Sequence, residues 1–187
     1  MPNWACGLVS VSGTKRNVIN FVSRFIYDGD KEETEDPKLR YFARSFTNTE
    51  RQSVLDDIED AFNGQSEESE FTFEIQVDFA WSAFSCTIQG YPQDLPDECI
   101  TLMDACKADH VCADIKTEEG GMCFEEHITC DKLGQVTSEC MELQSYKCPG
   151  CGYITGLASF NDADEYSCPE CGDVGLEAVG SEEIANG

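Results

Sequence analysis

Two short cysteine motifs near the C-terminal end of the chain constrain its folding more than any other feature. The first reads Cys-Pro-Gly-Cys-Gly from Cys148 and the second reads Cys-Pro-Glu-Cys-Gly from Cys168, which gives the spacing C-x2-C-x16-C-x2-C. A C-x2-C turn directs two thiolates at one ion, proline pre-sets the turn, and the following glycine accepts a positive φ. Four sulfurs at this spacing are typical of a closed zinc site, with no coordination position left for chemistry. We therefore predict a structural metal site held by Cys148, Cys151, Cys168 and Cys171.

The ligand set constrains the identity of the metal less firmly. The segment Tyr146–Gly152, taken with the second motif, resembles the paired loops of rubredoxins, which implies an iron-binding electron carrier. Rubredoxins usually separate their two loops more widely, and the chain has no Glu-x-x-His pair for a di-iron partner site. Tetrahedral four-cysteine sites are mostly zinc sites, so we expect one structural Zn²⁺, with iron as the alternative.

The most regular stretch of the remaining chain is Phe71–Trp81. Apolar side chains alternate there with polar ones; the apolar set is Phe71, Phe73, Ile75, Val77, Phe79 and Trp81. A period of two residues predicts a β-strand with one buried face, because successive side chains of a strand point to opposite sides.

Hydrophobic periods and turn residues predict the other elements. Apolar residues spaced three and four apart predict helices over 15–27, from Asn48 or Thr49 to Phe62, and over 97–108. Shorter strands are expected at 8–11, 39–46, 111–117, 122–130 and 135–143, with turns at Pro92–Pro96, Gly120-Gly121 and 131–134. This order of elements predicts an α+β domain with its helices on one face of a mostly antiparallel sheet.

The chain divides into three expected parts. Residues 1–144 form the α+β domain, 145–175 the small zinc ribbon, and 176–187 a mobile acidic tail with too few apolar residues to pack firmly. No apolar run approaches the ~20 residues of a membrane-spanning helix, and the first residues do not resemble a secretory signal. We therefore expect a protein of the host-cell cytosol, where thiols are kept reduced.

The opening residues resemble a known family. Met1-Pro2-Asn3-Trp4, the strand end Val9–Gly13 and the segment Phe79-Ala80-Trp81-Ser82 are similar, in the same order, to motifs of the YubB-type ferredoxin-like domains of phages and plasmids. The resemblance covers about residues 1–143 and implies a split β-α-β sandwich and an origin in a mobile element, without an established activity. Two features depart from it. Ala83-Phe84 follows Trp-Ser where the family usually has prolines, and a C-terminal metal ribbon is not a usual part of the family.

The net charge of −25 is unevenly distributed along the chain. Residues 1–51 are nearly neutral, whereas residues 52–187 hold thirty acidic residues against four lysines, a net charge of −26. Such a surface repels the phosphate backbone of DNA or RNA and favours encounter with a basic protein. Two acidic loops are the first candidates to contact that partner: Glu67, Glu68 and Glu70 in one, and Asp162, Asp164 and Glu165 in the other.

The remaining cysteines and histidines are weaker site candidates. Five of them fall in or beside the last three predicted strands and could gather around a second metal: Cys112, Cys123, Cys130, His110 and His127. They contain no C-x2-C motif, which weakens that hypothesis. Glu125-Glu126 indicate a solvated strand edge. No catalytic constellation is visible, so we expect no enzymatic activity.

Three functions fit this sequence. An acidic protein of a mobile element can occupy the cationic nucleic-acid channel of a host defence protein, such as a CRISPR effector nuclease, and block DNA loading; this anti-CRISPR type of inhibition is our leading hypothesis. The alternatives are the iron electron carrier and a zinc-ribbon transcription accessory protein. The last is disfavoured because Lys147 is the only basic residue of the ribbon, against five acids between Asp162 and Asp173.

Overall fold

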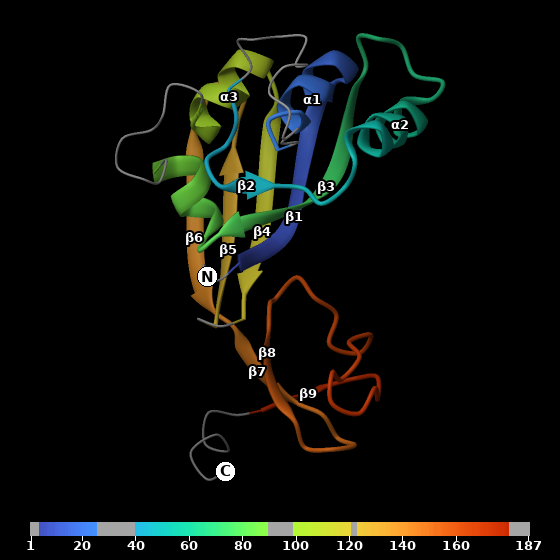
Figure 1. Cartoon of the computed structure of the whole chain (residues 1–187), viewed down its shortest axis with the longest axis vertical. Helices are drawn as coiled ribbons and strands as arrows, with labels where there is room; N and C mark the ends of the chain where they lie inside the picture. The colour runs from blue at the N-terminus through green and yellow to red at the C-terminus, as the bar shows by residue number, and fades with distance from the viewer. Residues whose placement is uncertain (1–3, 26–39, 90–98, 121–122, 180–187) are drawn as a thin grey trace.

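A six-stranded sheet, a layer of helices and a small ribbon make up the protein (Figure 1). The structure is a computed structural model that describes residues 4–25, 40–89, 99–120 and 123–179. The elements of the first domain are β1 (Trp4–Thr14), α1 (Lys15–Val22), β2 (Ser45–Phe46), α2 (Arg51–Phe62), β3 (Glu70–Ala80), the π-helical turn η1 (Ser85–Gln89), α3 (Leu102–Asp109), β4 (Cys112–Glu119), β5 (Phe124–Cys130) and β6 (Val136–Glu142). The ribbon contains β7 (Gln144–Lys147), β8 (Ile154–Leu157) and β9 (Glu177–Ala178).

The large sheet has the strand order β2-β3-β1-β4-β5-β6, and every neighbouring pair is antiparallel. β3 and β4 flank β1 and are both antiparallel to it, so they run in the same direction, with η1 and α3 in the connection between them. The helices lie on one face of this sheet (Figure 1). The predicted α+β class with a mostly antiparallel sheet is confirmed.

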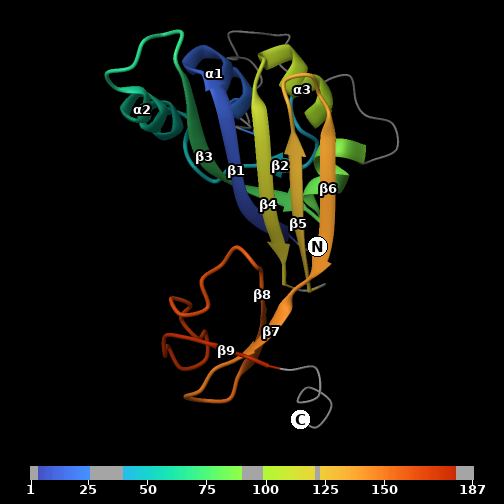
Figure 2. The same cartoon turned by 180° about the vertical axis from the view of Figure 1, so that it is seen from behind.

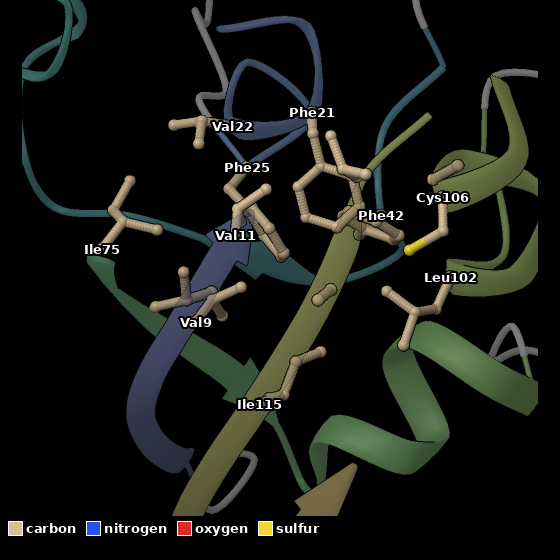
Figure 3. Packing of buried hydrophobic residues seen from close by; sticks show 14 of the residues in the cluster. Val9, Val11, Phe21, Val22, Phe25, Phe42, Ile75, Leu102, Cys106 and Ile115 are labelled. Carbon is tan, nitrogen blue, oxygen red and sulfur yellow. The ribbon is translucent and has the colours of Figure 1, made fainter. Parts of the chain in front are cut away.

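The core lies between the helices and the sheet. The strand predicted at Phe71–Trp81 forms as β3 and ends one residue earlier, at Ala80: its apolar side chains from Phe71 to Phe79 are buried, whereas Glu70, Thr72, Glu74 and Gln76 are exposed. Aromatic rings fill the space beneath α1, where Phe25 lies 4.6 Å from Phe42 and 6.1 Å from Phe79 between ring centroids. Figure 3 shows this cluster, with Leu102 and Cys106 of α3 beside it.

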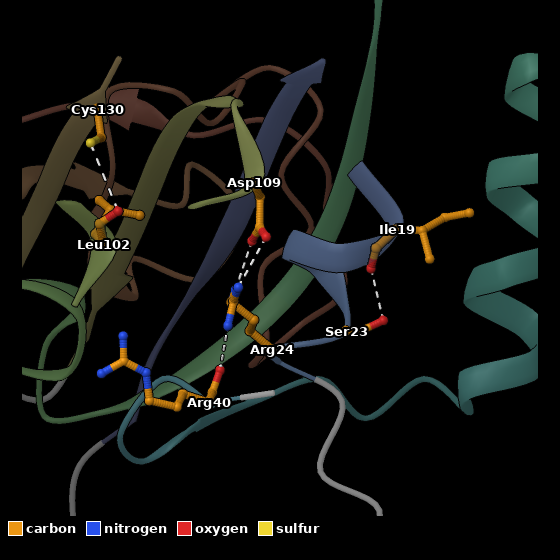
Figure 4. A network of polar contacts seen from close by, with 7 residues as sticks. All are labelled: Ile19, Ser23, Arg24, Arg40, Leu102, Asp109 and Cys130. Carbon is orange, nitrogen blue, oxygen red and sulfur yellow. Dashed lines mark hydrogen bonds and ion pairs between the residues drawn. The ribbon is translucent and has the colours of Figure 1, made fainter. Parts of the chain in front are cut away.

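A buried ion pair joins the end of α1 to the end of α3 (Figure 4). Arg24, in the turn after α1, donates from Nε to Oδ2 of Asp109 at 2.7 Å and from Nη2 to Oδ1 at 3.0 Å. Its remaining nitrogen, Nη1, donates to the carbonyl oxygen of Arg40 at 2.8 Å. One guanidinium therefore holds together two helix ends and the segment that leads into β2.

The central strand passes very close to its neighbour at Gly7. A Cβ atom at this position would lie 1.9 Å from the carbonyl oxygen of Lys116 in β4. Because the obstacle is backbone within a hydrogen-bonded ladder, only glycine fits there without a shift of the two strands.

Two of the predicted helices are shorter than expected. The helix predicted over 15–27 ends at Val22 and continues as a turn to Phe25, and residues 26–27 lie outside the described residues. The helix predicted over 97–108 begins at Leu102, because the hydroxyl of Thr101 caps it by accepting a hydrogen bond from the Asp104 N–H at 3.2 Å. Cys99, expected on the inner face of that helix, forms instead an isolated parallel bridge with Tyr41.

The strand predicted at 39–46 is wrong for most of its length. Only Ser45–Phe46 pair with β3. Phe42 and Ala43 are both buried, so the expected alternation is absent, and Arg44 has a φ of 52° that breaks an extended chain. The next helix starts at Arg51 with Glu50 as its N-cap. Neither Asn48 nor Thr49, the two predicted caps, takes that position.

The two tryptophans are both exposed in part. Trp81 was expected on the buried face of β3, but the strand ends at Ala80 and Trp81 is 43% exposed with a φ of 76°. Trp4 is 41% exposed and packs edge-on against Phe46, with ring centroids 5.2 Å apart. Both side chains lie at the surface near the end of β3 at which the chain leaves the sheet.

The strand predicted at 8–11 is much longer and spans Trp4–Thr14 as β1, whereas the strands predicted at 111–117, 122–130 and 135–143 differ from β4, β5 and β6 by at most two residues at each end. The turn at 131–134 forms as predicted, with Oδ1 of Asp131 accepting from the N–H groups of Leu133 and Gln135. The predicted turn at Pro92–Pro96, Gly121 in the other hairpin turn, and Met1–Asn3 of the family motif lie outside the described residues. Among the helices that the structure describes, none is both long enough and apolar enough to cross a membrane.

Candidate metal centre

The ribbon is a three-stranded sheet in the order β8-β7-β9. The first cysteine motif forms the turn between β7 and β8, and the second precedes β9, which returns to pair with β7 at Tyr146 and Lys147. The predicted tail at 176–187 therefore begins too early. Leu176 and Val179 are buried, and the Leu176 N–H donates to the carbonyl of Ala163 at 2.8 Å. Residues 180–187 of that tail lie outside the described residues.

The four predicted ligands come together in the ribbon. The sulfur atoms of Cys148, Cys151, Cys168 and Cys171 all lie within 4.8 Å of one another, with 3.6 Å between Cys148 and Cys171 and 3.6 Å between Cys151 and Cys168. A tetrahedral ion with metal–sulfur bonds of ~2.3 Å requires sulfur–sulfur separations of ~3.8 Å. The donor set and its spacing therefore fit one tetrahedral metal ion.

The two motifs fold in the same way. The N–H of Cys148 donates to the carbonyl of Tyr153, and that of Cys168 to the carbonyl of Asp173, each at 2.8 Å. In each turn the glycine N–H donates back to the carbonyl of the first cysteine. Gly152 and Gly172 have φ of 79° and 78°, as predicted for this turn, so the local sequence alone forms each half of the site.

Peptide N–H groups and the neighbouring sulfurs set the acidity of these thiols. Burial raises the pKa of Cys168, but hydrogen bonds from the N–H groups of Cys171 and Glu170 and from neighbouring thiols outweigh it and lower that pKa to about 7. For Cys171 the N–H of Asp173 lowers the pKa, yet partial loss of solvent around the sulfur and the neighbouring thiols raise it to about 12 overall. Four sulfurs this close cannot all ionise at neutral pH unless a cation lies between them.

Aromatic side chains shield the inner side of the cluster. Cys148 and Cys168 are buried and Cys151 and Cys171 are exposed. Leu176 completes the small apolar cluster, and four half-buried side chains pack on it: Tyr146, Tyr153, Ala163 and Tyr166. Because this apolar cluster is small, a metal ion held by the four thiolates would supply much of the folding free energy of the ribbon.

Carboxylates of the sheet anchor the ribbon to the first domain. The Ser159 N–H donates to Oε2 of Glu125 at 2.5 Å, and Asn161 Nδ2 donates to Oε2 of Glu118 at 2.8 Å. Burial raises the pKa of Glu118, partly offset by hydrogen bonds from the Ala158 N–H and from Asn161. The sequence does not predict these hydrogen bonds between the sheet and the ribbon, because a carboxylate that faces a loop far along the chain carries no local sequence signal.

The expectation of a solvated edge at Glu125-Glu126 is wrong. Both side chains are buried, Glu125 beneath the ribbon and Glu126 on the inner face, where it accepts from the Ala83 N–H at 2.7 Å. Burial raises the pKa of the Glu126 carboxyl, and its N–H and hydroxyl donors lower it in part. These glutamates fix the turn that follows β3 and the loop that follows β8.

The six predicted partner-binding carboxylates are exposed but lie in two separate places. Glu67, Glu68 and Glu70 precede or begin β3, whereas Asp162, Asp164 and Glu165 lie in the ribbon at the opposite end of the long axis (Figure 1). Glu70 is paired with Lys132, and the Asp162 carboxylate accepts from the Asp164 N–H at 2.9 Å. The structure therefore does not unite these loops into one acidic patch.

The second metal site considered above is not assembled in the part of the chain that the structure describes. There, only the four ribbon cysteines bring three or more potential ligand atoms within 4.8 Å of one another. Cys130 is buried in the core, Cys123 is exposed at a hairpin, and His127 contacts Asp114 at 3.1 Å. His110 ends α3 in the left-handed region, and Cys112 begins β4.

No protein-family model, curated protein or solved structure matches this chain. Its function is therefore inferred from its own residues and their arrangement.

Proposed function

We propose that this chain is a non-enzymatic, zinc-binding interaction protein of a phage or other mobile element. It docks its acidic surface onto a basic host protein that handles nucleic acid, and it inhibits that protein by blocking DNA loading. A CRISPR effector nuclease is the partner class that fits best, because such proteins hold nucleic acid in broad cationic channels.

Uncompensated negative charge is the observation that carries this proposal. Residues 52–187 hold thirty acidic residues and four lysines, so ion pairs within this region leave most carboxylates without a cation. One of those lysines, Lys132, already pairs with Glu70. A field of this size repels phosphate groups and accelerates association with a cationic surface, at a rate that falls steeply as salt rises.

Zinc is the proposed metal, with a structural role. The four sulfurs complete the coordination sphere, so the ion supplies folding energy to the ribbon and offers no open position for catalysis. Iron binds the same donor set. Colourless protein with one zinc per chain by elemental analysis supports the proposal, and red, iron-containing protein would favour the rubredoxin-like electron carrier.

The proposed origin in a mobile element draws on the resemblance to YubB-type ferredoxin-like domains. Two parallel strands, β3 and β4, flank the antiparallel β1 and are connected through α3, an arrangement in keeping with a split β-α-β unit. A ferredoxin-like sandwich with an appended zinc ribbon is therefore the fold that we propose.

A cleavage assay tests the function directly. Purified, zinc-loaded protein is titrated into reactions of a panel of CRISPR effector nucleases with matched target DNA, at low and at physiological salt. We expect saturable inhibition of at least one effector, weakened as salt rises, with loss of DNA binding in a parallel gel-shift assay. Absence of inhibition across the panel, or inhibition by cutting the DNA or the guide RNA, would overturn the proposal.

A further inference from the structure

Among the residues that the structure describes, no helix lies on one face of the large sheet (Figure 2). We call it the outer face and define it by the side chains of β3, β1, β4, β5 and β6 that point away from the core. Its charged residues on the paired strands are Glu70, Glu74, Asp78, Asp114, Lys116, Glu118, Glu125 and Glu139, of which Glu125 is buried beneath the ribbon loop. It extends from the start of β3 to the point at which the ribbon loop covers Glu125. The outer face therefore lies between the two acidic loops predicted from sequence.

We propose that the outer face is the surface that docks the basic partner, and that it receives an arginine- or lysine-rich segment of that protein. The inference rests on the proposed function and identifies the binding surface. The sequence predicts instead that the partner contacts the acidic loops, which lie at the two ends of the molecule.

Three carboxylates of the outer face contact neutral donors or a histidine. Glu74 accepts a hydrogen bond from the Ser10 hydroxyl at 2.7 Å, and Asp78 accepts from the Asn48 amide at 2.7 Å, so both have neutral donors. Asp114 contacts His127, whose ring is charged only when protonated. Each carboxylate has further lone pairs for a guanidinium or ammonium group.

A hollow on this face provides a site for one cationic side chain. It has a volume of about 160 Å³ and is lined by Cys6, Gly7, Gln76 and Asp78 of the sheet and by 47–49 of the loop before α2. Burial and the nearby Asp78 carboxylate raise the pKa of the Cys6 thiol to about 11, so this thiol stays neutral. Asp78 is the carboxylic side chain among the residues that line this polar hollow, which suits a long basic side chain.

The outer face supplies about two-thirds of the area that a standard protein partner covers. The paired region is seven residues long on each of five strands. At ~3.3 Å per residue and ~4.8 Å per strand it covers roughly 550 Å², compared with the ~800 Å² that each partner buries in a standard interface. Leu8, in the middle of this surface, is 39% exposed and Met141 is 44% exposed. Such apolar side chains among charges provide anchors for a docked protein.

The charge of the outer face excludes other occupants. A second copy of the chain would bring like carboxylates together, and nucleic acid or an anionic membrane would be repelled. A cationic protein segment is the occupant whose charge complements this surface.

The test maps where a cationic peptide binds. Nona-arginine is titrated into ¹⁵N-labelled, zinc-loaded full chain, and amide shifts are followed by NMR at low and physiological salt. We expect the largest shifts at Cys6, Gln76, Asp78 and Asp114, with smaller ones at 63–69 and 162–166. Shifts concentrated in those two loops, or spread evenly over all exposed carboxylates, would overturn the proposal.

Two triple variants with equal charge change provide the control. Glu74→Gln/Asp78→Asn/Asp114→Asn removes three charges from the outer face, and Asp57→Asn/Glu67→Gln/Glu68→Gln removes three elsewhere. We expect the first to weaken peptide binding about tenfold and the second by no more than about twofold. Equal weakening refutes the proposed surface. If the first variant fails to fold, as its own spectrum would show, the wild-type shift map alone decides.

The cleavage assay separates failure of this surface from failure of the proposed function. If wild-type protein and the outer-face variant inhibit an effector equally, the function stands and the surface is wrong. If peptide binding maps to the outer face while no effector is inhibited, the surface stands and the function is wrong.

Discussion

Removal of the carboxylate of Asp109 should destabilise the α+β domain severely. Its ion pair with Arg24 is buried, with the two side chains 7% and 6% exposed, and Asp109→Ala would leave the guanidinium without a counter-charge. One-sided deletion of a buried pair costs ~3–5 kcal/mol. For a chain of this length ~1 kcal/mol corresponds to ~2–4 °C, so the melting temperature should fall by ~6–20 °C.

An exposed ion pair supplies the control for this measurement. Lys15 and Glu59 lie 2.6 Å apart, but the Glu59 side chain is 61% exposed, so Glu59→Ala should cost less than ~1 kcal/mol. The double variant Arg24→Met/Asp109→Leu, which fills the same space with apolar atoms, should recover most of the lost stability.

The assay is thermal and urea unfolding, each followed by circular dichroism with zinc in excess, so that the ribbon remains folded across the transition of the larger domain. Burial of the pair is the reason for the expected loss. If Asp109→Ala costs no more than Glu59→Ala, or if the double variant is as unstable as the single one, that reasoning is refuted.

Three further changes test other parts of the structure. Cys148→Ser should abolish metal binding in elemental analysis and shift the ribbon amide signals in NMR to random-coil positions, while the sheet signals persist because the two apolar clusters share no residue; retained stoichiometric metal would contradict this. Gly7→Ala should lower the free energy of unfolding by ~2 kcal/mol in urea, since its Cβ would lie 1.9 Å from the carbonyl of Lys116, and a neutral effect would show that β1 and β4 separate easily. Burial raises the pKa of Glu126 above its ordinary 4.5, so its contribution to stability is full below that pH and is lost as pH rises through the raised value. The stability of wild type relative to Glu126→Gln should therefore increase as pH falls toward 4.5, and a difference that does not change with pH would disprove it.

The sequence by itself determined the features whose contacts are local. Each cysteine turn closes within six residues, as in the hydrogen bond from the Cys148 N–H to the carbonyl of Tyr153, so motif and spacing suffice to predict it. The strand at 70–80 can be predicted from the sequence equally well, because the alternation of apolar and polar residues along eleven positions leaves a single way to bury its apolar side chains. Helix 51–62 follows from its own apolar period, although its cap does not.

The tertiary structure alone decided the features that depend on residues far apart in the chain. Glu126 is buried because a turn 43 residues earlier donates to it, and Glu125 because a ribbon loop 34 residues later does. Residues 40–44 curve away from an extended strand where Arg24, itself held by Asp109 85 residues away, binds the carbonyl of Arg40. The outer face, too, depends on the tertiary structure, because its residues come together only when the strands pair in the observed order. The same strand order separates the two acidic loops. Local patterns specify turns and faces, whereas the burial of a charge depends on which distant backbone donors the fold brings to it.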